Sequence, residues 1–313
     1  MEVQSILKTS GFILLETVGI PGNLTVMFTF LIIKLYSNKF MMTDIILTNL
    51  AFVNLLAVIS RCIPITVTDF EGLTIFNDNS CRLSVYTYRV SRGTSVCLTS
   101  LLSCYQFLII TSNSRWVALK QIMARSLCPV ILCLWGLNLF LYSWTIPIIF
   151  AKLKSNSTEY TLNLKFCFVV FQSYFSYTGN GLLYIVHVFS FVGLMVLASG
   201  SIISVLHQHK MQVENIRTSS RNRSMAEIKA TKAVLLLVAL YVILFGLDNF
   251  FWIYSLTIPR APSIISDARV FYASCYSSLS PVVIISTNKR IRKKLKYAIQ
   301  SHWSEKNNVS RGN

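Results

Sequence analysis

Seven long apolar runs limit what this chain can fold into more than any other feature of its sequence. A bilayer core about 30 Å thick needs about 20 helical residues to cross it, and each run reaches that length. Charged residues make up 13% of the 313 residues, against about 25% in a soluble domain. We therefore predict an all-α membrane protein with a seven-transmembrane helix bundle. The expected spans are 11–35, 43–67, 82–111, 126–150, 178–206, 230–256 and 267–288.

The basic residues predict how the bundle is oriented. If the amino terminus is extracellular, 19 of the 29 lysines and arginines fall in cytoplasmic segments, seven fall outside and three lie within spans. Basic residues favour cytoplasmic loops, so we expect this orientation in the plasma membrane. The placement also accounts for the net charge of +17 without a nucleic-acid partner. The expected organisation is an extracellular N-terminus at 1–10, the bundle at 11–288 and a cytoplasmic amphipathic helix and tail at 289–313.

The eight cysteines show no CxxC pair and no metal-like grouping, so we expect no metal and no cofactor. Six lie within predicted spans, where a free thiol ordinarily serves as a small apolar side chain. Cys81 begins the third span on the outer side, and Cys167 lies in the outer loop 151–177. Disulfides persist in oxidising compartments, and we therefore expect these two to be bridged. Asn156, in the sequence NST of the same loop, is the expected glycosylation site.

The sequence contains no GxSxG, HExxH or Gly-rich phosphate-binding motif, and we expect no enzymatic activity. Transporters usually show inverted repeats, and channels show charged or carbonyl-lined filters. Neither pattern is seen here, and a small transporter or channel is the alternative outside the receptor class. Seven spans, an outside amino terminus, a loop disulfide and a basic cytoplasmic face are the features of a G-protein-coupled receptor.

The segment 88–110, YRVSRGTSVCLTSLLSCYQFLII, resembles the third span of vomeronasal type 1 receptors, a group that includes related fish olfactory receptors. NLAFVNLL at 49–56, EIKATKAVLLLV at 227–238 and ASCYSSLSPVVIIS at 273–286 resemble the same family. The resemblance implies a pheromone or odorant receptor in chemosensory neurons. Such a receptor binds a small molecule in the extracellular half of the bundle and activates a heterotrimeric G protein of the Gi/Go type. Type 2 bitter taste receptors are the alternative family.

Three positions depart from the larger rhodopsin-like class. Gln106 stands where that class usually has the Arg of its DRY motif, and Asn54 stands where it usually has a sodium-binding Asp. The segment SPVVI keeps Pro281 of the NPxxY motif but has no Tyr. Within the vomeronasal family these residues are normal, so the ionic-lock and sodium-site mechanisms are not carried over.

Arg61, Arg89 and Arg92 lie within predicted spans, together with the acids Glu16 and Asp248. A charge at the centre of a bilayer costs about 2.5–3.5 kcal/mol, so such groups usually pair inside the bundle. In a structural interpretation, Arg89 or Arg92 pairs with Asp248 or Glu16 and locks spans 1, 3 and 6 together. In the alternative, a surplus arginine contacts an anionic ligand group, because its guanidinium suits carboxylates, sulfates and phosphates.

Aromatic and polar residues of the outer half complete the predicted ligand site. Aromatic side chains also commonly fill helix bundles, so packing is the more ordinary role of each. The predicted ligand-binding residues are Arg89, Arg92, Tyr88, Arg61, His187, Asp248, Asn249 and Trp252, with Tyr272 as a further candidate.

Two cytoplasmic segments are expected to meet partners. The segment KRIRKKLK at 289–296 and the apolar residues that follow at helical spacing predict an amphipathic helix on anionic membrane lipid. The loop 207–229 between spans 5 and 6 is the expected G-protein surface. The predicted coupling residues are Gln106, Arg217, Arg221, Arg223 and Lys229.

Overall fold

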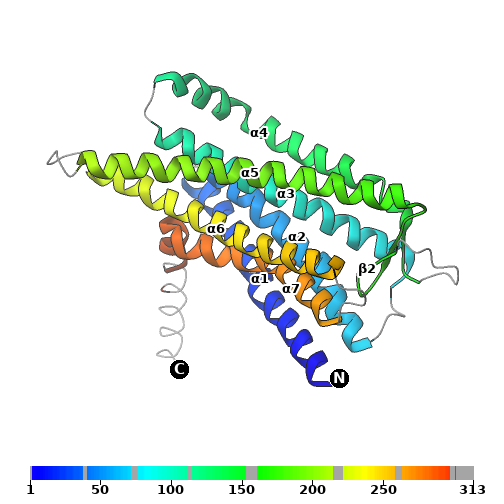
Figure 1. The fold of residues 1–313 in the computed structure, drawn as a ribbon. Helices are drawn as coiled ribbons and strands as arrows, with labels where there is room; N and C mark the ends of the chain where they lie inside the picture. Colours follow the sequence, from blue (N-terminus) through cyan, green and yellow to red (C-terminus); the bar gives the residue numbers. More distant parts are fainter. Residues whose placement is uncertain are drawn as a thin grey trace, which may run out of the picture.

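The chain forms an elongated bundle of long helices (Figure 1). The computed structural model describes residues 2–37, 41–71, 76–111, 114–152, 161–213, 221–257, 263–296 and 300. Seven helices in this part are long and apolar enough to cross a membrane, which confirms the predicted all-α fold. They are α1 Glu2–Ser37, α2 Met42–Glu71, α3 Asp78–Ile110, α4 Ser114–Ser143, α5 Tyr174–Val213, α6 Arg221–Thr257 and α7 Ser263–Thr287.

The fourth span ends earlier than its apolar run predicts. The run continues through Pro147 to residue 150, but α4 ends at Ser143 and a short 3-10 helix, Ile146–Ile148, follows. Proline has no backbone N–H, and its ring clashes with the preceding helical turn. The next residues, Ile149–Phe150, form strand β1 and pair with a later strand.

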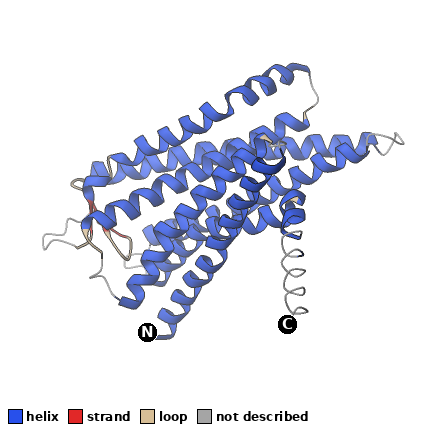
Figure 2. Cartoon of the chain, turned by 180° about the vertical axis from the view of Figure 1, so that it is seen from behind, coloured by secondary structure: helices blue, strands red, loops and turns tan. Residues whose placement is uncertain are grey.

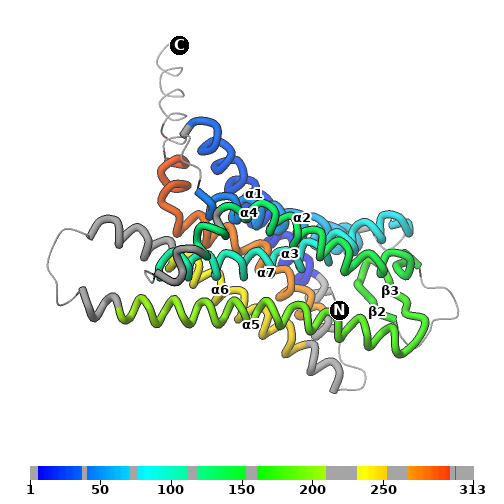
Figure 3. Tube along the Cα trace, turned by 90° about the horizontal axis from the view of Figure 1, so that it is seen from above, coloured from blue at the N-terminus to red at the C-terminus, as the bar shows by residue number. Residues whose placement is uncertain are grey.

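α3 runs through the middle of the bundle (Figure 3) and contacts α2, α4, α5 and α6. Its segment from Ser91 to Ser103 is rich in Ser, Thr, Gly and Cys and is almost wholly buried. Small residues let helix backbones approach closely inside a membrane. The hydroxyls of Thr99 and Ser103 donate to the carbonyls of Ser95 and Thr99 at 2.8 and 2.9 Å. The hydroxyls of Thr99 and Ser103 therefore find their hydrogen-bond acceptors within α3 itself.

Gly93, the glycine of the RVSRG motif, lies at a close approach of α3 to α4. A Cβ at this position would overlap Asn138 Oδ1 and lie 2.9 Å from Tyr142 Cε2. Asn138 is fully buried and donates its amide N–H to the Leu134 carbonyl at 2.8 Å. The Asn138 side chain therefore has little room to move, and only glycine fits opposite it.

We expect Gly93→Ala to lower the free energy of unfolding by about 1–3 kcal/mol, since the added methyl group overpacks this contact. Cell-surface expression and thermal unfolding of the solubilised protein measure the effect. Gly136→Ala in α4 is the matched control, because no atom lies within 4 Å of a Cβ built there. Equal stability of the two variants would contradict this account of the motif.

α1 lies against α7 through another glycine and a buried amide. A Cβ on Gly19 would lie 2.8 Å from Ser278 Oγ and 3.0 Å from its Cα. Asn23 donates its amide N–H groups to the carbonyls of Gly19 at 2.8 Å and Ser277 at 3.0 Å. The buried Asn23 therefore holds the two helices together.

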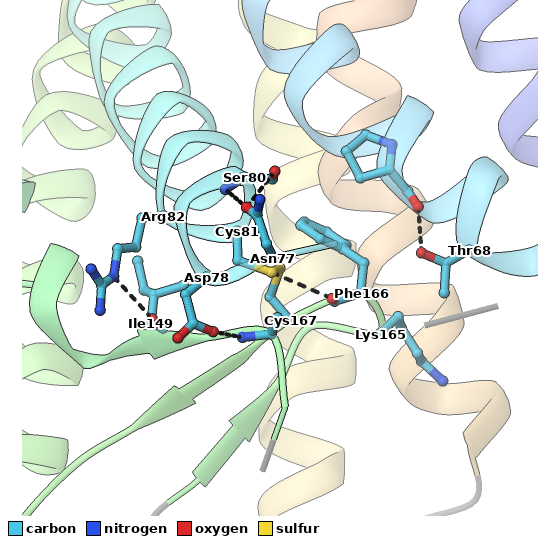
Figure 4. Close-up of a disulfide and its surroundings, with 12 residues drawn as sticks. Thr68, Asn77, Asp78, Ser80, Cys81, Arg82, Ile149, Lys165, Phe166 and Cys167 are labelled. Carbon is cyan, nitrogen blue, oxygen red and sulfur yellow. Dashed lines mark hydrogen bonds between the residues drawn. A yellow bond between two sulfur atoms is a disulfide. The ribbon is translucent and has the colours of Figure 1, made fainter. Parts of the chain in front are cut away.

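A disulfide and a small sheet mark one end of the bundle, which we call the disulfide end (Figure 4). Cys81 of α3 is bonded to Cys167, with 5.8 Å between the two Cα atoms. The sheet is antiparallel in the order β1–β3–β2. Its other strands are β2 Thr161–Asn163 and β3 Phe168–Val170. We refer to residues 149–152 and 161–171 together as the cap sheet.

Polar contacts attach the cap sheet to two helices. Asp78 Oδ1 accepts from the Ala151 amide at 2.8 Å, and Arg82 Nε donates to the Ile149 carbonyl at 3.3 Å. Both contacts lie in the first turns of α3 beside the disulfide (Figure 4). On the other side, Lys165 Nζ lies 2.8 Å from Asp267 Oδ1 of α7. The cap sheet is thus joined to both α3 and α7.

A short helix follows α7 at the opposite end of the bundle (Figure 2). Its described run is 289–296, the first part of the predicted amphipathic helix, and Asn288 Oδ1 accepts from the Arg290 amide at 2.9 Å. Ile291 is fully buried, and Arg290 Nη1 lies 2.8 Å from Asp44 Oδ2 of α2. The exposed basic residues of this helix are Lys289, Arg292, Lys293, Lys294 and Lys296.

Candidate ligand-binding site

An ion pair joins α3 to α6 inside the bundle. Arg92 Nη2 lies 2.5 Å from Asp248 Oδ2, and the two side chains are 19% and 8% exposed. Arg92 Nη1 donates to the Tyr88 hydroxyl at 3.0 Å, and Arg92 Cζ lies 6.0 Å from the Tyr184 ring centroid. Of the pairings that the sequence left open, the structure contains the one between Arg92 and Asp248.

A second arginine shares this carboxylate. Arg269 Nε of α7 lies 3.5 Å from Asp248 Oδ1. By its position in the sequence, Arg269 is one of the seven basic residues expected outside the membrane, and this contact was not predicted. Spacing could have revealed it: Asp248 lies nine residues before Thr257, the end of α6, and Arg269 lies six residues after Ser263, the start of α7. Successive antiparallel helices place such positions at comparable depths, because each residue advances a helix by about 1.5 Å.

Glu16 and Arg89 stand apart from this ion pair. Glu16 Oε1 accepts from Thr66 Oγ1 of α2 at 2.6 Å, so α1 is not locked to α3 through this acid. Arg89 Nη1 donates to Asn180 Oδ1 of α5 at 3.3 Å. The expected lock between spans 1, 3 and 6 is therefore replaced by one between α3, α6 and α7, because the second partner of Asp248 comes from α7.

Arg61 of α2 is a buried cation, with 7% of its surface exposed. Its Cζ lies 4.6 Å from the ring centroid of Tyr88, a cation–π geometry. Its Nε has no hydrogen-bond partner among the described residues. No carboxylate in that part of the chain lies within ion-pair distance of it. Within the described part of the chain, the contact found for the positive charge of Arg61 is thus the face of the Tyr88 ring.

A small cavity lies beside the ion pair, between α3, α6 and α7. Its volume of about 20 Å³ suffices for one or two water molecules. A larger ligand therefore requires these three helices to move apart. The polar and aromatic lining consists of Arg92 and Ser95 from α3, Tyr241 and Phe245 from α6, and Tyr272 and Tyr276 from α7.

Hydrogen bonds continue from this cavity toward the centre of the bundle. Ser95 Oγ donates to Asn54 Oδ1 at 2.7 Å, and Asn54 Nδ2 donates to Ser280 Oγ at 2.8 Å. The hydroxyls of Thr99 and Tyr276 lie 2.9 Å apart. Asn54 thus joins α2, α3 and α7 through uncharged hydrogen bonds. It stands where the larger rhodopsin-like class usually has a sodium-binding Asp.

His187 and Asn249 make other contacts and do not line this cavity. His187 of α5 has its Nε2 3.7 Å from Cys97 Sγ and its ring edge-on to Tyr142, with 6.3 Å between the centroids. Asn249 donates to the Phe245 carbonyl of its own helix at 2.7 Å. In this arrangement both residues serve the packing of the bundle.

The remaining predicted residues lie elsewhere or outside the described part. Gln106 is buried in α3, toward the end opposite the disulfide. The side chains of Trp252, Arg221, Arg223 and Lys229 lie outside the described residues, although their backbones belong to α6, and Arg217 and Asn156 lie outside them altogether.

Seven membrane-spanning helices, a disulfide that ties the third helix to the following loop and a charged cluster within the bundle define a seven-helix receptor. The chain matches the vomeronasal organ pheromone receptor family over residues 9–297 and belongs to that family of G-protein-coupled receptors. It is 36% identical over 297 residues to Olfactory receptor class A-like protein 1 of Danio rerio, and the match covers 94% of this chain and 93% of the relative.

Two mammalian relatives are similarly extensive. Vomeronasal type-1 receptor 90 of Rattus norvegicus is 30% identical over 292 residues, with 89% of this chain and 90% of the relative covered. Vomeronasal type-1 receptor 4 of Homo sapiens is 28% identical over 289 residues, with 90% and 94% covered. The predicted family is thus confirmed. The protein is a multi-pass plasma-membrane receptor, not an enzyme, and its partners are a small-molecule ligand and a G protein.

We expect Asp248→Asn to lower the free energy of unfolding by about 3–5 kcal/mol, because it leaves Arg92 and Arg269 inside the bundle without their carboxylate. Thermal unfolding of the solubilised receptor measures this loss. Asp267→Asn is the matched control: it breaks the Lys165 pair at the disulfide end, where the side chains are 26% and 17% exposed, and should cost about 1 kcal/mol or less. A smaller loss for Asp248→Asn than for the control would contradict the central role of this carboxylate.

Proposed function

We propose that the protein is a chemosensory receptor for pheromones or odorants whose ligand binds at the contact of α3, α6 and α7 and thereby activates a G protein. The carboxylate of Asp248 holds all three helices together, and this observation carries the proposal. A ligand that changes these contacts changes how the helices pack. To shift the equilibrium, it must bind the active packing more tightly than the inactive one.

The proposed ligand carries an anionic group. Arg92 and Arg269 both contact the carboxylate of Asp248. Arg61 lies over the Tyr88 ring and has no ion-pair partner among the described residues. A cavity with surplus positive charge inside a membrane favours anions over amines and neutral molecules. Tyr88 contacts both Arg61 and Arg92 and positions the two guanidinium groups.

In the proposed orientation the disulfide end is extracellular, with residues 1–10 outside, 11–288 in the bundle and 289–313 in the cytoplasm. The basic residues exposed on 289–296 support this orientation and would contact anionic lipid. The G protein, of the Gi/Go type by family resemblance, would bind at the end of the bundle that carries residues 289–296. Its expected contacts are Gln106 and the loop residues Arg217, Arg221, Arg223 and Lys229.

Nucleotide exchange in a reconstituted system tests the receptor function. The full chain in lipid nanodiscs is mixed with purified Gi, Go or Gq and a panel of small acids, amines and neutral molecules. We expect one or more acids to accelerate GDP–GTP exchange on Gi or Go and to leave Gq unchanged. Acceleration by amines only would contradict the anionic ligand. Flux of a compound across the membrane without exchange on any G protein would contradict the receptor function.

Glycosidase digestion tests the orientation. We expect the receptor from cultured cells to lose mass on digestion and Asn156→Gln to abolish that loss, because Asn156 is the sequon placed in the lumen. Asn222→Gln and Asn308→Gln, which alter sequons expected in the cytoplasm, serve as controls and should digest like the unaltered chain. A glycan on Asn222 or Asn308 would reverse the proposed orientation.

A further inference from the structure

The buried charges around Asp248 do not balance. Asp248 accepts from Arg92 at 2.5 Å and is in ion-pair contact with Arg269 at 3.5 Å. Arg61 is within electrostatic range of both arginines and has no ion-pair partner of its own among the described residues, so the positive charge here exceeds the one carboxylate that Arg92 and Arg269 share. Uncompensated charge inside a low-dielectric bundle is costly. A second anion at this place would lower that cost.

Arg61 offers an unused donor for such an anion. Its side chain is buried, its ring partner Tyr88 occupies one face, and its Nε has no partner among the described residues. An N–H of a buried guanidinium that lacks an acceptor forfeits a charge-assisted hydrogen bond. Arg61 can therefore donate a hydrogen bond to an acidic group without breaking an existing ion pair.

Arg269 is the more easily diverted of the two partners of Asp248. Its contact is longer than that of Arg92, and its side chain is 37% exposed, whereas that of Arg92 is 19% exposed. Arg92 is further held by the Tyr88 hydroxyl at 3.0 Å. An incoming acid would therefore draw Arg269 away and leave Arg92 with Asp248.

We propose that Arg61 and Arg269 together bind the carboxylate or sulfonate of an organic acid, and that Asp248 competes with this acid for Arg269. The inference rests on the proposed function and specifies its ligand site. On binding, Arg269 exchanges the carboxylate of Asp248 for the acid group of the ligand. The ion pair between α6 and α7 is released, while the ion pair between α3 and α6 remains.

Competition predicts opposite effects on acid binding for substitution of the two arginines and for substitution of Asp248. Arg61→Gln and Arg269→Gln each remove a contact to the acid and should weaken its binding roughly tenfold or more, the usual effect of losing a charge-assisted hydrogen bond. Asp248→Asn removes the competitor and should strengthen binding. Lys152→Gln is the control, because Lys152 is an exposed residue of the cap sheet and lies outside the site.

Binding is measured without a G protein, as the shift in thermal unfolding midpoint of the purified full chain. The probes are matched pairs that differ in charge: hexanoate and hexanamide, benzoate and benzamide, and naphthalene-2-sulfonate and its sulfonamide. We expect an acid of at least one pair to stabilise the unaltered chain and its amide to have no effect. The same acid should stabilise Asp248→Asn at lower concentration and Arg269→Gln only at higher concentration.

Several outcomes would overturn the inference. These are equal shifts from acid and amide in every pair, full retention of acid binding in both Arg61→Gln and Arg269→Gln, or weaker binding by Asp248→Asn. Chloride alone, titrated in parallel, would overturn it if it saturated the shift and left nothing for the organic acids to add.

Arg61→Lys serves as a second variant if Arg61→Gln does not fold, and it should retain part of the acid binding. Whether or not Arg61→Gln folds, the comparison of acid with amide on the unaltered chain shows whether the site prefers an anion. Acid binding without any nucleotide exchange would refute the proposed function and leave this site standing. Exchange driven only by amines or neutral molecules would refute this acid site and leave the receptor function standing.

Discussion

The arrangement of three helices in this receptor depends on one carboxylate. Asp248 of α6 lies between the guanidinium groups of Arg92 in α3 and Arg269 in α7. Charges in a membrane interior interact strongly because little water screens them. Arg92, the closer partner of this carboxylate, lines the small cavity, so a ligand bound there as proposed would meet the ion pair.

This ion pair is possible because α3 packs closely against its neighbours. The small residues between Ser91 and Ser103 make a narrow helix, and Gly93 lets Asn138 of α4 approach its backbone. Close packing of α3 leaves the longer side chains of the motif, Arg89 and Arg92, to reach into the remaining space toward α5 and α6. The arginines and the glycine of RVSRG are thus two parts of one packing arrangement.

The sequence could predict the seven spans, because long apolar runs allow few other folds in a bilayer. It could also nominate Cys81 and Cys167 for a bridge and Asp248 as a partner of Arg92. It could not predict the rotation of each helix about its axis. α6 is apolar on most sides, so the direction in which Asp248 points depends on the packing of α3 and α7. For the same reason the contact of Arg269 was not predicted, and His187 packs against Cys97 and Tyr142, away from the small cavity.

The two ion pairs of α7 near the disulfide end involve residues only two positions apart. Asp267 holds Lys165 of the cap sheet, and Arg269 holds Asp248 of α6. The cap sheet is in turn bound to α3 through the disulfide and Asp78. A closed ring of contacts therefore runs from α3 through the cap sheet and α7 to α6 and back. A displacement of one link is transmitted to the others through these contacts, so the cap sheet and the charges inside the bundle are mechanically coupled.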